Sequence, residues 1–201
     1  MPEDKRIVKT RALLRTALQQ LMETVSFDDI KVKQICKKSN VSRMTFYSHF
    51  SDKYALLDNL YDDFLARVMQ RCIDKCRKNG EKDDVRAYSV NLYVSYAEEL
   101  YDGRMPFFRA VFDERGYAFT TFTDFITHAA RDLIRKIKDC SGLSLSDEQL
   151  MSLLCYGPMD FLRSTAYSEN IEPVRAAEIC RSYYSVAIDF ALDSADAQKS
   201  Q

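Results

Sequence analysis

The sequence predicts an all-α protein. In most segments the apolar residues recur three or four positions apart, which is the spacing of one face of an α-helix. No segment alternates apolar and polar residues as a half-buried strand does, and the 201 residues include only 5 Gly and 4 Pro. Because 46% of the residues are hydrophobic, the chain can bury a core, which excludes a disordered or collagen-like chain.

The first 55 residues predict three helices. Residues 5–25 carry one apolar stripe, and the segment Ser26–Asp29 interrupts it. Two short helices are expected at 31–38 and 42–50. Asn40 lies in the tight turn between them, where a left-handed residue is needed and Asn is the commonest choice after Gly.

The rest of the chain predicts a helical bundle. Further helices are expected at 52–79, 85–101, 107–112, 118–140, 146–168 and 173–192, with Gly103 and Gly142 ending two of them. Ser51 is the expected cap of the first, with Asp52 placed favourably against the helix dipole. Ser146 and Gln149 form a capping box, and Gly157-Pro158 should kink the helix that follows.

Charge is distributed unevenly along the chain. Residues 1–55 hold 11 Lys/Arg and 6 Asp/Glu, a net charge of +5, whereas residues 56–201 hold 18 and 24, a net charge of −6. The overall charge of −1 is therefore the sum of a basic segment, which is suited to binding a polyanion, and an acidic remainder, which is expected to have a different function.

Neither end of the chain suggests export or a membrane. The charged N-terminus lacks the apolar run of a signal peptide, and no apolar stretch approaches the ~18–20 residues of a membrane span, so we expect a cytoplasmic protein. In that compartment thiols stay reduced, and we interpret the cysteines as small buried hydrophobic residues. They are Cys36, Cys72, Cys76, Cys140, Cys155 and Cys180.

The two short helices have the spacing of a helix-turn-helix, which places its second helix in the major groove of DNA. Phe46 and Phe50 lie four residues apart on that helix, and we interpret them as buried anchors. Residues 5–57 resemble the N-terminal domain of the tetracycline-repressor-like (TetR/AcrR) family of bacterial transcriptional regulators. The matching segments are Lys31–Cys36, Val41-Ser42, Thr45–Phe50 and Asp52–Leu57, with Asn40 where the family usually has Gly and Cys36 where it usually has Ala.

Arg43 is the first candidate for a base contact, because its guanidinium matches O6 and N7 of guanine. Thr45 is a candidate for a thymine methyl or a phosphate. The resemblance implies backbone contacts by Tyr47, His49 and Lys53, and Lys5, Arg6 and Lys9 would add sequence-independent attraction. The full set of expected DNA-binding residues is Lys33, Ser42, Arg43, Met44, Thr45, Tyr47, Ser48, His49 and Lys53.

The resemblance also implies how the chain is organised. It implies a helix-turn-helix DNA-binding domain at 1–52, an effector-binding and dimerisation domain at 53–194, and a polar tail at 195–201. Core packing accounts for most aromatic residues of the second domain, but their density also suits an apolar pocket. The candidate pocket residues are Tyr88, Tyr93, Phe108, Phe112, Phe122, Phe125, His128 and Tyr156.

Small and large residues interleave in the last two helices, as in closely packed helices. A homodimer is what a palindromic operator of two half-sites requires. The candidate interface residues are Leu154, Phe161, Leu162, Ala176, Cys180, Tyr183 and Ala187.

Other functions find less support in the sequence. It has two histidines and no phosphate loop, nucleophile elbow or metal-binding spacing, so we expect no enzyme, metal or cofactor. A redox switch at Cys72 and Cys76 is one alternative, and a ligand-independent or activating regulator of the same fold is another. The main interpretation is a homodimeric repressor that a small-molecule effector releases from its operator.

Overall fold

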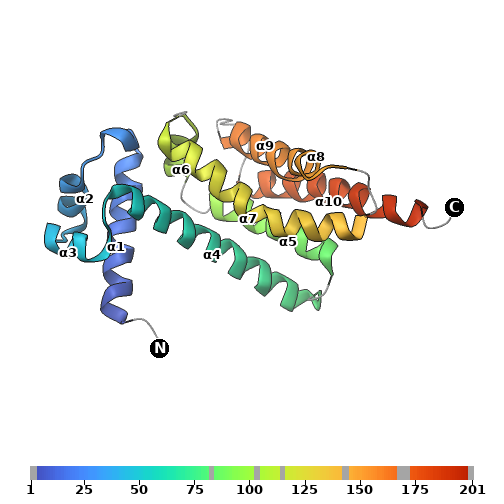
Figure 1. The fold of residues 1–201 in the computed structure, drawn as a ribbon, viewed down its shortest axis with the longest axis horizontal. Coiled ribbons are helices and arrows are strands. Elements are labelled where there is room, and N and C mark those ends of the chain that lie inside the picture. The colour runs from blue at the N-terminus through green and yellow to red at the C-terminus, as the bar shows by residue number, and fades with distance from the viewer. Residues whose placement is uncertain are drawn as a thin grey trace. The chain divides into compact units, whose positions relative to one another are not determined.

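The computed structural model describes residues 4–81, 84–101, 105–113, 116–141, 145–166 and 173–198 (Figure 1). All elements in these ranges are helical, which confirms the expected all-α class. They are α1 (Lys5–Met22), the 3₁₀ turn η1 (Phe27–Asp29), α2 (Val32–Ser39), α3 (Arg43–His49), α4 (Lys53–Asn79), α5 (Val85–Tyr101), α6 (Met105–Asp113), α7 (Tyr117–Ser141), α8 (Asp147–Met151), the π-helical turn η2 (Ser152–Tyr156), α9 (Gly157–Ala166) and α10 (Pro173–Gln198). Within these ranges, no helix combines the length and the apolar character that crossing a bilayer demands.

Several helix ends differ from the expectation. The cap of α4 is Asp52 and not Ser51, because the Asp52 carboxylate accepts hydrogen bonds from the backbone N–H groups of Tyr54 and Ala55 at 2.9 and 2.8 Å. α10 continues six residues beyond the expected end at Leu192. The expected stops at Gly103 and Gly142 lie outside the described residues.

A π-helical turn stands where the sequence predicts a kink. Ser152–Tyr156 forms this wide turn directly before Gly157 and Pro158. Proline has no N–H to continue the α-helical ladder, and a π turn re-pairs the backbone groups that this leaves without a partner. The expected capping box at Ser146 and Gln149 is confirmed, with the Gln149 N–H donating to the Ser146 hydroxyl at 3.2 Å.

The chain divides into two compact units, and each is described by itself. Unit 1 comprises the described residues within 1–64 and 106–123, and unit 2 those within 65–105 and 124–201. In unit 1, α1 packs against α2 and α3 (Figure 1). Its core includes Leu14, Leu18, Ile35 and Phe46, all fully buried.

A second cluster of unit 1 is aromatic. The rings of Tyr61 and Phe122 lie 5.1 Å apart, and those of Phe64 and Phe108 lie 5.2 Å apart. The buried Tyr61 hydroxyl donates a hydrogen bond to the Ala118 carbonyl at 2.8 Å. This bond satisfies the polar atom of an otherwise apolar cluster.

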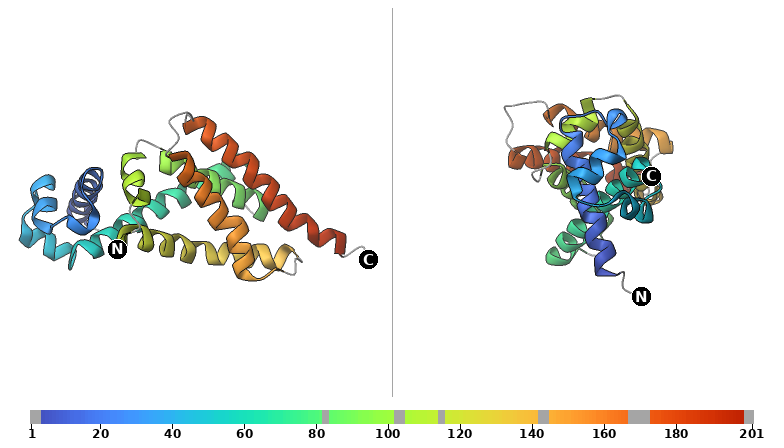
Figure 2. Two further views of the ribbon diagram at one scale, coloured as in Figure 1. Left: turned by 90° about the horizontal axis from the view of Figure 1, so that it is seen from above. Right: turned by 90° about the vertical axis from the view of Figure 1, so that its left-hand side faces the viewer.

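In unit 2, α5 is the central helix. Most of its residues from Ser89 onward are buried, and α10 packs along it (Figure 2). Ion pairs tie α5 to α4: the buried Glu99 carboxylate contacts Arg67 at 2.5 Å and Arg71 at 3.0 Å. Because removal of one partner would leave a charge buried in the core, these pairs fix how the two helices pack.

Candidate DNA-binding surface and ligand cavity

The turn between α2 and α3 has the geometry that the sequence predicts. Asn40 adopts the left-handed conformation, with φ 54° and ψ 37°. Its N–H and that of Val41 both point to the Cys36 carbonyl, the latter at 3.1 Å. These bonds satisfy the end of α2 and set the direction of α3.

Two aromatic residues anchor α3. Phe46 is fully buried and Phe50 is nearly so, and their rings lie 6.1 Å apart. The Arg11 guanidinium of α1 lies 5.9 Å from the Phe50 ring. A helix of seven residues is not stable alone, so these contacts hold it on the unit.

The opposite face of α3 is exposed. Met44 is 84% and Tyr47 is 57% exposed, and Arg43 is exposed beside them. Burial raises the pKa of the Cys36 thiol, while the nearby Arg43 guanidinium acts in the opposite direction.

The serine and threonine hydroxyl groups of this helix form hydrogen bonds within it. Ser42 caps α3 by accepting a hydrogen bond from the Thr45 N–H at 3.0 Å. The Ser48 hydroxyl donates to the Thr45 carbonyl at 2.7 Å. Ser42 and Ser48 are exposed, whereas Thr45 and His49 are half-buried. The side chains that project furthest without such a local role are therefore those of Arg43, Met44 and Tyr47.

Lys53 has a structural contact that the sequence does not reveal. Its ammonium donates to the carbonyls of Phe27 and Asp28, both at 2.8 Å. It also lies 4.7 Å from the Phe27 ring centre and 5.3 Å from that of Tyr54. Two of its three N–H groups thus hold the η1 turn, which leaves one for a phosphate.

Basic side chains are also exposed on the two neighbouring helices, α1 and α2. The expected contact Lys33 is exposed on α2, as are Lys37 and Lys38. On α1, three further basic residues are exposed: Lys5, Arg6 and Lys9. Unit 1 therefore presents positive charge on each of the three helices of its N-terminal part, as a phosphate-binding surface needs.

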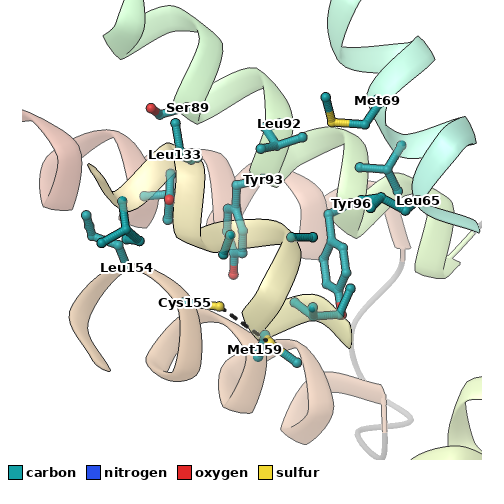
Figure 3. Close-up of a pocket in the computed structure, with 16 residues that line it drawn as sticks. Leu65, Met69, Ser89, Leu92, Tyr93, Tyr96, Leu133, Leu154, Cys155 and Met159 are labelled. Atoms are coloured by element: carbon teal, nitrogen blue, oxygen red, sulfur yellow. Dashed lines mark hydrogen bonds between the residues drawn. The ribbon is translucent and has the colours of Figure 1, made fainter. Parts of the chain in front are cut away.

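Unit 2 contains a cavity of about 220 Å³ (Figure 3). Residues of α4, α5, α7, the π turn, α9 and α10 form its wall. They are Leu65, Val68, Met69, Ser89, Leu92, Tyr93, Tyr96, Ile126, Ala129, Ala130, Leu133, Ile134, Leu154, Cys155, Met159 and Tyr184. Ala129 is exposed whereas Tyr96 and Tyr184 are buried, so the cavity leads from the surface into the core.

Hydrogen bonds within the protein occupy polar groups of this wall. The Tyr93 hydroxyl donates to the Pro158 carbonyl at 2.9 Å, and the Ser89 hydroxyl donates to the Val85 carbonyl at 2.7 Å. The Cys155 thiol lies 3.9 Å from the Met159 sulfur, as the dashed line in Figure 3 marks. Burial raises the pKa of the Cys155 thiol to about 11, so this thiol is neutral at pH 7.

Of the eight expected pocket residues, Tyr93 is in this wall and seven are elsewhere. Phe108, Phe112 and Phe122 pack in the core of unit 1. His128 and Tyr156 are exposed on the surface, and two others, Tyr88 and Phe125, are half-buried outside the cavity. Aromatic content alone does not distinguish a packed core from a cavity wall, because both select the same side chains.

The expected interface residues fall into three groups. Leu154, Cys180 and Ala187 are buried within the chain itself. Tyr183 is 47% exposed and Phe161 is half-buried. For the remaining two, Leu162 and Ala176, the side chains lie outside the described part of the chain.

Sequence reasoning missed one helix cap and several residues of the cavity. Asp52 as a cap and Tyr96, Tyr184 and Met159 as cavity residues were not among the candidates. One signal for the cavity is present in the sequence. Residues 85–101 have no clear polar face, which predicts a central helix with other helices packed around it, and a cavity between such helices would include residues of this segment.

Comparison with known proteins finds a family model that matches within unit 1. The family model of bacterial regulatory proteins, tetR family, matches residues 13–60. The uncharacterised HTH-type transcriptional regulator YxbF of Bacillus subtilis is 36% identical over 67 residues, 33% of this chain and 18% of that protein. The HTH-type transcriptional regulator EthR of Mycolicibacterium smegmatis is 43% identical over 57 residues, 28% of this chain and 26% of that protein.

The match to these curated relatives thus spans 18% and 26% of their lengths. Among solved structures, a TetR-family protein of Syntrophomonas wolfei matches with a TM-score of 0.69 at 15% sequence identity, over 90% of this chain and 96% of that chain. At this identity the likeness is one of fold.

Proposed function

We propose that the chain is a transcriptional regulator of the tetR family that binds double-stranded DNA, because residues 13–60 match the model of that family. The observation that carries this proposal is α3, which Phe46 and Phe50 anchor from one side while Arg43, Met44 and Tyr47 project from the other. A helix held in this way can enter a major groove without losing its support. Its setting beside the lysines of α2 supplies attraction to phosphate.

A selection from random duplexes, followed by gel-shift titration, tests this function. We expect a preferred duplex with two related half-sites one helical turn apart. Arg43→Ala should weaken binding to that duplex by about 1–3 kcal/mol and relax the preference at one base position. Arg77→Ala, which removes an exposed arginine near the end of α4, is the matched control and should leave affinity unchanged. Unchanged affinity and unchanged base preference of the Arg43→Ala protein would contradict the assignment.

We further propose that the DNA-binding form is a homodimer. Exposed apolar side chains of α10 and the π turn support it: Tyr183, Val186 and Phe190 are 47%, 69% and 60% exposed, and Tyr156 is 43% exposed. Large apolar side chains gathered on one helix usually mark an interface. Val186→Glu should give a monomer in sedimentation, and Ala66→Glu, at an exposed site of α4, should not. A Val186→Glu protein that stays dimeric would contradict this choice of surface.

The cavity of unit 2 is the proposed effector site, and repression with release by the effector is the proposed role. α4 contributes Leu65 and Met69 to the cavity wall and begins at Lys53, which holds the η1 turn. A ligand that shifts this helix would change the spacing of the two recognition helices of the dimer. A shift from 1:99 to 99:1 takes about 5.5 kcal/mol of differential binding. An activator would use the same coupling in the opposite direction.

A thermal-shift screen tests whether a ligand exists, because a compound that binds the native state stabilises it.

The alternative switch at Cys72 and Cys76 gains no support. Both side chains are buried, and burial together with the neighbouring Cys76 raises the pKa of Cys72 to about 12. A thiol of this kind reacts slowly with oxidants because little thiolate is present. Unchanged DNA binding after mild oxidation is the expected result.

A further inference from the structure

Three features of the cavity of unit 2 restrict which compounds it can bind: its charge, the kind of apolar surface in its wall, and its size. The first feature is charge: among the described residues that line it, none is Asp, Glu, Lys, Arg or His. The thiol of Cys155 is neutral there, as derived above. A buried anion without a cationic partner is strongly unfavourable, so this wall rejects carboxylates and phosphates.

The second feature is the kind of apolar surface. Three tyrosine rings line the cavity, those of Tyr93, Tyr96 and Tyr184, and the rings of Tyr93 and Tyr184 stack at 4.4 Å. Sulfur atoms of Met69, Cys155 and Met159 lie in the same wall (Figure 3). Aromatic rings interact favourably with other rings and with sulfur, beyond the gain from simple burial. An aliphatic chain gains only burial from such a wall.

The third feature is size. A cavity of about 150 Å³ lined by apolar side chains holds benzene in another protein. The volume here is about 220 Å³, which leaves room for several more heavy atoms. Two fused rings, or one ring with a short substituent, fit that volume.

From these features we infer that the cavity binds a neutral aromatic compound of one or two fused rings. As a ligand this compound follows from the cavity alone, whereas its action as an effector rests on the proposed function. A single hydroxyl or similar group on the compound is compatible with the wall, because such a group can remain at the exposed end beside Ala129.

Three probes of similar size separate the ligand classes: 1-naphthalenemethanol, which is neutral and aromatic, 1-naphthoate, which has the same rings and a charge, and 1-decanol, which is neutral and aliphatic. Calorimetry on the full chain measures their affinities without DNA. Since the chain has no Trp, the naphthyl fluorescence provides a second readout. We expect 1-naphthalenemethanol to bind at least about tenfold more tightly than either of the others. Equal or tighter binding of 1-naphthoate or 1-decanol would overturn the inference.

Cavity variants locate the binding. Ala130→Phe fills the cavity and should weaken binding of 1-naphthalenemethanol at least about tenfold. Ala66→Phe makes the same change at an exposed site of α4 and should leave it unchanged. In case Ala130→Phe does not fold, Met69→Lys places a cation in the wall and should reverse the preference in favour of 1-naphthoate. Failure of Met69→Lys to raise the affinity for 1-naphthoate would overturn the assignment of the site.

The same compound added to the protein–DNA complex separates the two proposals. If 1-naphthalenemethanol binds but the complex persists, the ligand class stands and the effector role is wrong. If an ionic or aliphatic compound dissociates the complex and Ala130→Phe abolishes that effect, the effector role stands and the ligand class is overturned.

Discussion

Lys53→Met tests how the start of α4 supports the DNA-binding unit. The substitution removes two charge-assisted hydrogen bonds to the Phe27 and Asp28 carbonyls and the contacts of the ammonium with two aromatic rings. A hydrogen bond to a charged group contributes about 1.5–3 kcal/mol when buried, and a cation–π contact about 0.5–1 kcal/mol. Lys53 is half-buried, so water replaces part of each bond. We therefore expect a loss of about 2 kcal/mol in the free energy of unfolding.

Urea unfolding followed by circular dichroism measures this loss, and Lys78→Met, at an exposed lysine near the other end of the same helix, is the control. The remaining N–H of Lys53 is the candidate phosphate contact. If it binds DNA, the slope of log K against log salt should become less negative by about 0.9 for each subunit, which is about 1.8 for the proposed homodimer. A stability equal to that of the control would refute the structural role. Lower stability with an unchanged slope would remove Lys53 from the DNA-binding residues.

Three further substitutions have effects that follow from the structure. Asn40→Gly should leave the free energy of unfolding within about 0.5 kcal/mol of that of the unmodified protein, whereas Asn40→Ala should lower it by about 1 kcal/mol, because alanine is strained at the positive φ of 54°. Thermal unfolding of the two variants measures this difference. Phe46→Ala should lower the free energy of unfolding by about 3–5 kcal/mol, whereas Met44→Ala, at an exposed residue, should change it by less than about 0.5 kcal/mol. Urea unfolding measures both values, and a smaller difference between the two variants would contradict the anchoring of α3 by Phe46. Burial raises the pKa of Cys155 in the folded protein to about 11, so the stabilisation that the neutral thiol gives to the folded state is fully present below pH 9 and is lost as the pH rises toward about 11. Cys155→Ala should therefore make the fall in the free energy of unfolding between these pH values less steep. An equally steep fall in the variant would show that another group causes it.

Local signals in the sequence predict most helix boundaries. Asn40, the Ser146–Gln149 box and the start of α10 at Pro173 are each found where the residue types place them, because capping depends on neighbours a few positions away. Ser51 and Asp52 illustrate the limit. Both residue types cap helices, and only the backbone geometry decides that the Asp52 carboxylate meets the free N–H groups.

The two sites differ in how far the sequence defines them. The exposed face of α3 follows from one helix and the positions of Phe46 and Phe50, so periodicity is sufficient to find it. The cavity depends on how several distant helices pack, and periodicity along one helix does not encode that packing. Tyr93 and Phe122 therefore look equivalent in the sequence, although one lines the cavity and the other fills the core of unit 1.

The division of the chain bears on how such a protein evolves. All the described residues that line the cavity belong to unit 2, whereas α1, α2 and α3 belong to unit 1. Substitutions in the cavity wall therefore alter no side chain of α3, the proposed recognition helix, or of the core that supports it. The family model matches residues 13–60, the part of the chain that such substitutions leave untouched. If the cavity binds an effector and α3 binds DNA, as proposed, lineages can exchange one chemical signal for another while they keep their existing binding sites in the genome.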